Sequence, residues 1–200
     1  GDFIIPYLLS NNQKSIKYIL TKKPYYIRQL SKIVDECFEN EIGIQDSFKS
    51  ISDEDFNSYF YIVIKDNKVI GGARQTFSNI YTEQSLPNEY FDINYKKMFD
   101  ELNLTNKTYC QISKFAVLPQ YRRNKQIYDE GFSLFRDRMK KFNSKYMFIS
   151  ADLPRIKLYN RLVNKYFEFA GMKEVNSKNW PGFEKTSFPK GVWVAAYRGR

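Results

Sequence analysis

A cluster of basic residues follows a strand-like run in the middle of the chain. Residues 111–117 read as a strand, Pro119 ends it, and Arg122, Arg123 and Lys125 come directly before a helical pattern. Backbone N–H groups at the start of a helix bind phosphate well when cations lie beside them. The sequence therefore indicates a phosphate site in this loop. The alternative is a basic loop that contacts only solvent.

Residues that commonly support metal or hydrolytic chemistry are scarce. The chain has no histidine, and its two cysteines, Cys37 and Cys110, lie far apart in sequence. These counts argue against a zinc site and against a histidine-dependent triad, so no metal is expected. Proton transfer must then rely on a carboxylate, a water molecule or a substrate amine that arrives neutral.

Periodic patterns predict the elements that would position this loop. Helices are recognised by apolar residues three and four positions apart, and strands by short or alternating apolar runs. In chain order we expect a helix over 28–40, a hairpin of strands 59–65 and 68–76 joined at Asp66-Asn67, a short helix near 95–102, a strand over 108–117, a helix over 124–142, a strand over 146–151, a helix starting near Pro154, and strands after Met172, the clearest at 191–197.

This order of elements predicts an α/β fold. A helix, an antiparallel hairpin and then alternating strands and helices give a central mixed, twisted sheet with helices on both faces. Pro154 suits the first turn of the last helix, whose buried face runs to Phe167 and which Gly171 is expected to end. No repeat or linker divides the chain, so residues 1–200 are expected to form one domain with an insertion at about 77–107.

Charge and composition narrow the classes of partner. The 200 residues include 32 basic and 22 acidic side chains, a formal charge of +10, so the surface should attract nucleic acid, an anionic membrane or an acidic protein. No apolar run approaches the ~20 residues that cross a bilayer, and we expect a soluble, cytoplasmic protein. Aromatic residues make up 18% of the chain; this surplus fits an apolar ligand pocket or the bias of an AT-rich genome.

The strand, the basic loop and the following helix resemble the GNAT acyltransferase fold, a three-layer sandwich. In that family the strand binds the pantetheine arm of the acyl donor and the loop binds its phosphate. The resemblance implies that Phe115, Ala116 and Val117 bind the arm. It implies that the phosphate is bound by Arg122, Arg123, Asn124, Lys125 and Gln126. The family's glycine signature lines up with residues 123–128, where Gln126 and Tyr128 replace its two small residues.

Two further segments resemble the acyl-homoserine lactone synthases and the long-chain N-acyl amino acid synthases. They are Val69-Ile70-Gly71-Gly72-Ala73-Arg74, read as a Gly-Gly-Ala turn followed by an arginine, and the strand Gln111-Ile112-Ser113-Lys114-Phe115-Ala116-Val117, about thirty residues further on. Those enzymes take their acyl group mainly from acyl carrier protein, whose arm has one phosphate. The resemblance implies an N-acyltransferase that moves a fatty acyl chain from acyl carrier protein, or acyl-coenzyme A, to the amine of an amino acid or similar small acceptor.

The same resemblance assigns residues to the acceptor site. Arg74 and Lys114 match family positions on two strands, and Arg28 and the acidic residues Asp46, Asp53 and Asp55 resemble residues that shape the acceptor site in the synthases. Phe38 is a candidate for the acyl pocket. Gln111 replaces a family glutamate, Lys114 replaces an arginine and an expected tryptophan is absent. These departures favour an amino acid or another amine over S-adenosylmethionine as the acceptor.

Four residues are the catalytic candidates. Gln111 and Ser113 would orient the acceptor amine or a water, and Asp152, at the end of the apolar strand 146–151, is the candidate general base. Glu36 is a weaker base candidate. Tyr166, or alternatively Tyr159, would protonate the leaving thiolate, and a backbone N–H between Phe115 and Val117 would stabilise the oxyanion.

Other interpretations remain open at this point. The chain is alternatively an acetyl-coenzyme A-dependent GNAT enzyme acting on a protein, an RNA or a small amine, or a nucleic-acid binder without enzymatic activity. Arg74 is equally a structural ion-pair partner of Asp53 or Asp55. Gln111 would then be a core-edge residue, and the phenylalanines Phe38, Phe60, Phe77, Phe115 and Phe148 would be core rather than acyl pocket.

Overall fold

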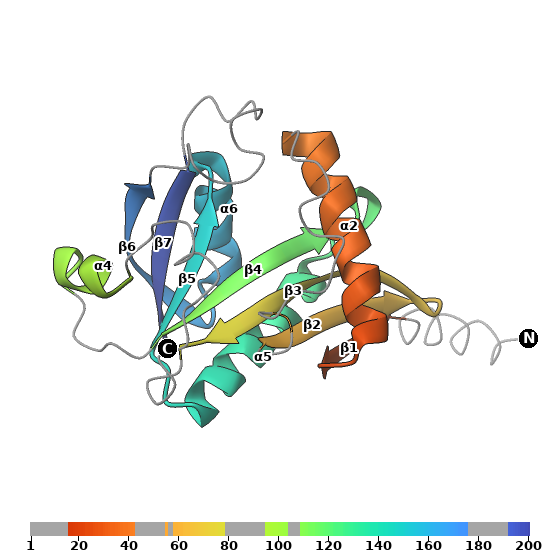
Figure 1. Ribbon diagram of the computed structural model, residues 1–200, viewed down its shortest axis with the longest axis horizontal. Coiled ribbons are helices and arrows are strands. Elements are labelled where there is room, and N and C mark those ends of the chain that lie inside the picture. The colour runs from red at the N-terminus through yellow and green to blue at the C-terminus, as the bar shows by residue number, and fades with distance from the viewer. Residues whose placement is uncertain (1–15, 43–54, 56–57, 79–94, 104–108, 176–191) are drawn as a thin grey trace, which may run out of the picture.

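The structure, a computed structural model, describes residues 16–42, 55, 58–78, 95–103, 109–175 and 192–200. Its strands form a seven-stranded sheet in the order β1-β2-β3-β4-β5-β7-β6 (Figure 1). In chain order the elements are β1 (Ile16–Thr21), α2 (Pro24–Ile42), β2 (Ser58–Lys65), β3 (Lys68–Phe77), α4 (Tyr95–Glu101), β4 (Tyr109–Val117), the 3-10 helix η2 (Pro119–Tyr121), α5 (Lys125–Lys141), β5 (Tyr146–Ala151), α6 (Leu153–Val163), β6 (Phe167–Val175) and β7 (Val192–Gly199).

The predicted hairpin is confirmed. Asp66 and Asn67 join β2 to β3 with φ angles of 50° and 60°, the left-handed pair that a two-residue type I′ turn requires. Both residue types tolerate this conformation because their short polar side chains bond locally. The sequence patterns did not predict β1, which pairs antiparallel with β2 and forms one edge of the sheet.

Helices cover both faces of the sheet, as the predicted fold class requires. On one face α2 buries Leu30 and Val34 against β2 and β3, and on the other α5 buries Phe132 and Phe135 in a core that α6 shares. Figure 1 shows α2 in front of the sheet and α5 behind it. Among the described residues, no helix is long and apolar enough to span a bilayer.

The predicted end of the last helix is wrong. α6 ends at Val163, and the chain enters β6 at Phe167, pairing antiparallel with β7. Gly171 does not end a helix; it lies inside β6, at a register shift, with φ at 130°. Phe167 and Phe169 alternate with a glutamate, which is a strand period. The apolar residues of α6 run directly into that period, so spacing alone merged the two elements.

The strands β4 and β5 pair only over their first residues. Tyr109–Ile112 are parallel partners of Tyr146–Ile149, and the two strands then diverge, as Figure 1 shows. β4 continues to Val117 and β5 to Ala151. The edge of β4 that faces β5 is therefore without a strand partner beyond Ile112, within the part of the chain that the structure describes.

A β-bulge begins at the same point of β4. The register between β3 and β4 shifts between Gly72 and Arg74, and Lys114 takes a left-handed φ of 49°. The Gly-Gly-Ala segment lies in the middle of β3, as the predicted strand over 68–76 requires, and its reading as a turn is wrong. Its glycines allow close packing: a Cβ on Gly72 would lie 2.1 Å from the backbone oxygen of Tyr61.

Replacing Gly72 with alanine should test this packing. The added methyl meets backbone rather than a movable side chain, so we expect Gly72→Ala to lower the free energy of unfolding by about 1–3 kcal/mol. Lys68→Ala, an exposed change in the same strand, is the matched control and should stay within about 0.5 kcal/mol of the wild type. Urea denaturation measures both; equal stability of the two variants would contradict the packing.

Candidate active site

The open edge of β4 is the first component of the site. β3 pairs with the other edge, with Val117 opposite Gly71 and Ala116 opposite Gly72. Beyond Ile112 the edge that faces β5 pairs with no strand among the described residues; the bulge at Lys114 interrupts its strand geometry, and the Val117 carbonyl accepts from Arg122. A flat chain containing amides can bind such an edge as an added strand does. The Phe115–Val117 segment, which sequence reasoning assigned to the donor arm, lies on this edge.

An aromatic cluster supports β4 on the α5 side of the sheet. The Phe115 ring stacks on Tyr128 and Phe132, with both centroids 6.0 Å away, and meets the Tyr159 ring edge-on at 5.7 Å. Tyr128 occupies one of the signature's two small positions, and its ring fills space beside the strand instead of leaving room for a ligand. Burial raises the pKa of Tyr128.

The basic loop is tied to the body of the protein by one of its three cations. Arg122 donates from Nε to the carbonyl of Val117 at 2.8 Å, forms an ion pair with Glu41 on α2, and approaches the Cys37 sulfur at 3.5 Å. Arg123 and Lys125 are exposed. The predicted phosphate cluster therefore divides into one cation that holds the loop in place and two that face solvent.

Several backbone N–H groups of this loop donate hydrogen bonds to carbonyls of the same loop. The N–H of Tyr121 bonds Leu118 at 2.9 Å, and the N–H of Asn124 bonds Tyr121 at 3.1 Å. Asn124 caps α5, its side chain accepting from the N–H of Gln126 at 3.1 Å. This capping uses an amide that, in a glycine-rich loop, would face a phosphate.

A buried charge cluster lies next to the open edge. Asp55 is fully buried and accepts from Arg74 Nη1 at 2.7 Å and from Lys114 Nζ at 3.1 Å. Arg74 also donates from Nε to Ser113 Oγ at 3.0 Å. The ion pair between Arg74 and Asp55 that the sequence left open is therefore present. In a regular strand Ser113 and Lys114 would point to opposite faces; the bulge lets both reach this cluster.

A second set of polar side chains lies on three neighbouring strands, two residues along β3 and β4 from Arg74 and Ser113. Ser58, Thr76 and Gln111 are directly opposite one another on β2, β3 and β4. The hydroxyls of Ser58 and Thr76 lie 2.6 Å apart, and the Tyr95 hydroxyl donates to Gln111 Oε1 at 2.9 Å. Gln111 and Tyr95 are buried. Sequence reasoning missed Tyr95, because its place in a polar insertion offers no spacing signal.

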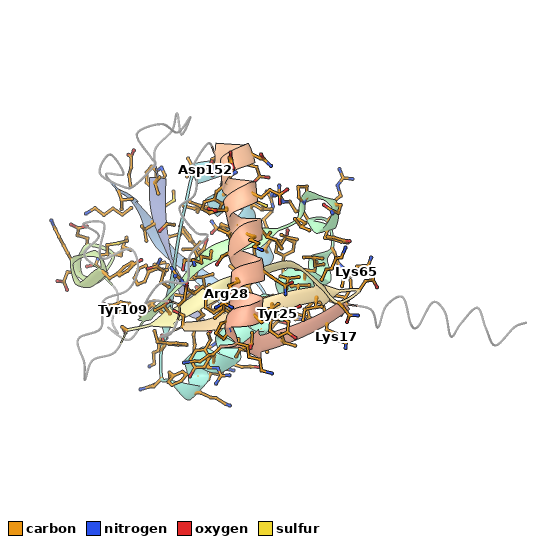
Figure 2. All side chains as sticks on the ribbon, turned by 45° about the vertical axis from the view of Figure 1, so that its right-hand side comes forward. Lys17, Tyr25, Arg28, Lys65, Tyr109 and Asp152 are labelled. Atoms are coloured by element: carbon orange, nitrogen blue, oxygen red, sulfur yellow. The ribbon has the colours of Figure 1, made fainter. Side chains whose placement is uncertain are left out.

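The predicted base, Asp152, occupies a helix cap. It is the N-cap of α6 and accepts from the Arg155 backbone N–H at 3.2 Å and from Arg155 Nη1 at 2.7 Å. Figure 2 shows it at the end of the sheet remote from Tyr109. The position after β5 agrees with the sequence analysis, while the hydrogen bonds are those of a structural cap.

The two candidate tyrosines differ in position. Tyr166 follows the C-terminal end of α6 and has the Lys165 ammonium 5.4 Å from its ring centroid. Tyr159 lies inside α6 and packs against Phe115 on β4. Burial raises the pKa of Tyr159 to about 12. Of the two, Tyr159 is the one that contacts Phe115, in the part of β4 that no longer pairs with β5.

The other residues predicted from the sequence are exposed on α2, belong to the core, or lie outside the described residues. Arg28 lies on the exposed side of α2 (Figure 2), and Glu36 is also exposed. Phe38 is half-buried against the core beneath α2, and Phe60 and Phe148 are core residues. Asp46 and Asp53 lie outside the described residues. In the part of the chain that is described, no three histidine, cysteine, aspartate or glutamate side chains gather as a metal site would require.

A diverging strand pair, a loop leading into a helix and helices on both faces define the class as a GNAT-fold acyltransferase. The chain belongs to the FeeM N-acyl amino acid synthase family, whose sequence model matches residues 29–176. Its activity is therefore N-acyl transfer.

Solved structures agree with this class. FeeM, an N-acyl amino acid synthase from uncultured soil microbes, aligns with a TM-score of 0.63 at 12% identity, covering 90% of this chain and 89% of that one. The acyl-homoserine lactone synthase LasI aligns at 0.55 and 12% identity over 91% and 88%. An N-acetyltransferase from Staphylococcus aureus Mu50 aligns at 0.52 and 12% identity over 91% and 95%. No curated protein sequence matches the chain.

The buried charge cluster gives a stability prediction. Asp55→Asn removes the carboxylate and leaves Arg74 and Lys114 buried without it, so we expect the free energy of unfolding to fall by about 3–5 kcal/mol. Glu101→Gln breaks the exposed ion pair with Lys173 and should leave the denaturation midpoint nearly unchanged. Chemical denaturation of the two variants is the measurement. A small loss for Asp55→Asn would mean that the cations rearrange to reach solvent.

Proposed function

We propose that the enzyme transfers a medium or long fatty acyl chain from the phosphopantetheine thioester of acyl carrier protein to the amine of an amino acid or a similar small acceptor. The observation that carries the donor assignment is the loop between β4 and α5. Its amide at Gln126 is used in capping, Arg122 is engaged with Glu41, and Tyr128 fills a position where a small residue would leave room.

Such a loop suits one phosphate better than two. Arg123 and Lys125 are the exposed cations at the start of α5, and together with the helix N-terminus they are sufficient for a single phosphate. A pyrophosphate needs a closer backbone approach, which glycine permits and larger residues hinder. The arm of a carrier protein has one phosphate, whereas in coenzyme A that phosphate is part of a pyrophosphate.

The overall charge supports the same donor. Carrier proteins are strongly acidic, and a chain with a formal charge of +10 would attract one over a distance set by ionic strength. The screening length is about 10 Å at 0.1 M salt. Association with a carrier protein should therefore weaken as salt rises, while binding of a free pantetheine thioester should change less.

The chemistry follows from the open edge of β4. With the pantetheine arm on this edge, the thioester carbonyl lies near a backbone N–H between Phe115 and Val117, which stabilises the oxyanion. The acceptor nitrogen attacks the carbonyl carbon, a C–N bond forms and the C–S bond breaks. The amine loses a proton and the thiolate gains one. Because Asp152 is held as a helix cap by Arg155, we assign the amine proton to water.

Tyr159 is the proposed donor of the proton to the thiolate, and the water that takes the amine proton returns one to the phenolate. Tyr159 lies against Phe115, and its raised pKa of about 12 keeps the phenol protonated at neutral pH. A free tyrosine has a pKa of about 10. The raised value extends the pH range in which the acid is available, so activity should not fall through tyrosine ionisation until the pH is well above 10.

The deciding experiment is a product assay. Purified protein is incubated with carrier-protein thioesters of several acyl lengths and a pool of amino acids and amines, and N-acyl products are identified by mass spectrometry. We expect long-chain N-acyl amino acids. Turnover of acetyl-coenzyme A, with no product from any carrier thioester, would instead establish the acetyl-coenzyme A-dependent alternative.

The donor assignment has a matched pair of variants. Arg123→Ala with Lys125→Ala should raise KM for the carrier thioester about tenfold with little change in kcat, because phosphate binding is lost equally in the ground and transition states. Lys140→Ala with Lys141→Ala removes the same charge from the other end of α5. An equal rise in KM for both pairs would show general charge steering instead of a phosphate site.

The acid assignment predicts that the two tyrosines behave differently. Tyr159→Phe should lower kcat by about 10²-fold with little change in KM, because general acid catalysis is lost. Tyr166→Phe should be close to the wild type. For the wild type, kcat should be flat from about pH 8 to about pH 10, since the phenol stays protonated. An unchanged kcat for Tyr159→Phe would assign the proton to solvent.

A further inference from the structure

The last turn of α2 lies beside the loop between β4 and α5. Glu41, one residue before the end of this helix, forms an ion pair with Arg122 in the loop. In Figure 1 the arrowhead of β4 ends at α2. The Arg122 and Glu41 side chains are 36% and 33% exposed. The pair is therefore at the surface, where a ligand of the loop can reach it.

The Arg122 guanidinium has a protein partner at each of its three nitrogens. Nε donates to the Val117 carbonyl at 2.8 Å, Nη2 to the Cys37 sulfur at 3.5 Å and Nη1 to the Glu41 carboxylate. Burial raises the pKa of the Cys37 thiol, which keeps that neighbour neutral. Glu41 thus supplies the negative charge at Nη1, while the carbonyl and the sulfur fix where the guanidinium lies.

Helix stability does not account for a glutamate at this position. The C-terminal end of a helix has a partial negative charge, so an acidic side chain in the last turn is unfavourable there. Glu39 and Glu41 both lie in the last turn of α2, which has no basic residue. Glu39 is exposed, whereas Glu41 pairs with Arg122. Of the two glutamates, Glu41 is the one whose contact can influence the loop.

Arg122 is the third cation of a loop whose other two, Arg123 and Lys125, face solvent. Those two are sufficient for one phosphate at the start of α5. A second phosphate would need the third cation, and a guanidinium reaches phosphate oxygens through its own side chain, without the close backbone approach that glycines permit. Glu41 opposes a second phosphate in two ways: it occupies Nη1, and its carboxylate repels the added negative charge.

We infer that Glu41 is a donor-specificity residue: it withholds Arg122 from a second phosphate and so favours the single phosphate of a carrier-protein arm over the pyrophosphate of coenzyme A. This inference rests on the proposed function and adds the residue that selects the donor. Without Glu41, the Val117 carbonyl and the Cys37 sulfur still hold the guanidinium in place, and Nη1 becomes available to a pyrophosphate.

The test is calorimetric titration of the purified protein with two ligands. Phosphopantetheine has one phosphate, and dephospho-coenzyme A has a pyrophosphate and adenosine on the same arm. Glu41→Ala should raise the affinity for dephospho-coenzyme A relative to phosphopantetheine about fivefold, because the ion pair no longer has to be broken. Glu39→Ala removes the same charge from the same turn and should leave this ratio unchanged. Loss of a merely structural contact would weaken both ligands together.

Two results of this titration would overturn the inference. One is an equal ratio of the two affinities in Glu41→Ala and Glu39→Ala. The other is no detectable binding of dephospho-coenzyme A by Glu41→Ala. Both substitutions are at exposed positions of α2, so both variants should fold.

Arg122 supplies an independent check. In an Arg122→Gln background, Glu41→Ala should no longer shift the ratio, because the guanidinium that would bind the second phosphate is absent. The comparison is made between Arg122→Gln and the double variant, so any effect of Arg122→Gln on the loop itself cancels. A shift of the same size with and without Arg122 would assign the effect to the glutamate charge alone and overturn the inference.

Failure of the proposed function has a different signature. Turnover of acetyl-coenzyme A by the wild type, with no product from any carrier thioester, would overturn the proposed donor, and the ratio of the two affinities would still decide the role of Glu41. If carrier thioesters are accepted and the ratio is the same in the wild type and Glu41→Ala, the inference is wrong and the proposed function stands.

Discussion

A buried carboxylate between two cations organises the centre of this protein. Asp55 is held by Arg74 and Lys114, and a charge so far from water persists only when its partners are close and well oriented. Lys114 reaches Asp55 because β4 is bulged, with a left-handed backbone at that residue. A bulge also increases the local twist of a strand. Pairing of β4 with β5 stops at Ile112, directly before the bulge.

One irregularity thus shapes both parts of the candidate site. On the side of β4 that leaves β5, the backbone has no strand partner among the described residues, and Phe115, Tyr128 and Tyr159 pack behind it. On the face beneath α2 and α4, the same residues bring Arg74, Ser113 and Lys114 together. In the proposed reaction, donor and acceptor bind at adjacent positions on one strand, which is the proximity that acyl transfer needs.

The loop between β4 and α5 is held in place by its own side chains. Arg122 anchors the loop to α2 through Glu41, and Asn124 caps α5. These contacts stabilise the loop from within and leave Arg123 and Lys125 as its exposed cations. A loop stabilised by its own side chains depends less on a ligand for its conformation than a glycine-rich loop does.

Most of the framework could be read from the sequence by itself. The hairpin at Asp66-Asn67, the apolar face of α2, the buried run of β5 and the basic loop before α5 follow from local spacing, because turn geometry and helix and strand periods are properties of short segments. The resemblance to family positions also grouped Arg74, Gln111 and Lys114, and the structure has these residues on the neighbouring strands β3 and β4.

Only the tertiary structure decided how those residues are used. The boundary between α6 and β6 depends on hydrogen bonds to β7, and the bulge at Lys114 depends on the register with β3. Tyr95 meets Gln111 because α4 packs against the sheet through the buried Met98 and through Leu102, which lies against Gly171 on β6. Each of these outcomes is set by contacts between segments distant in sequence, and residue spacing within one segment does not specify which distant segment it will contact.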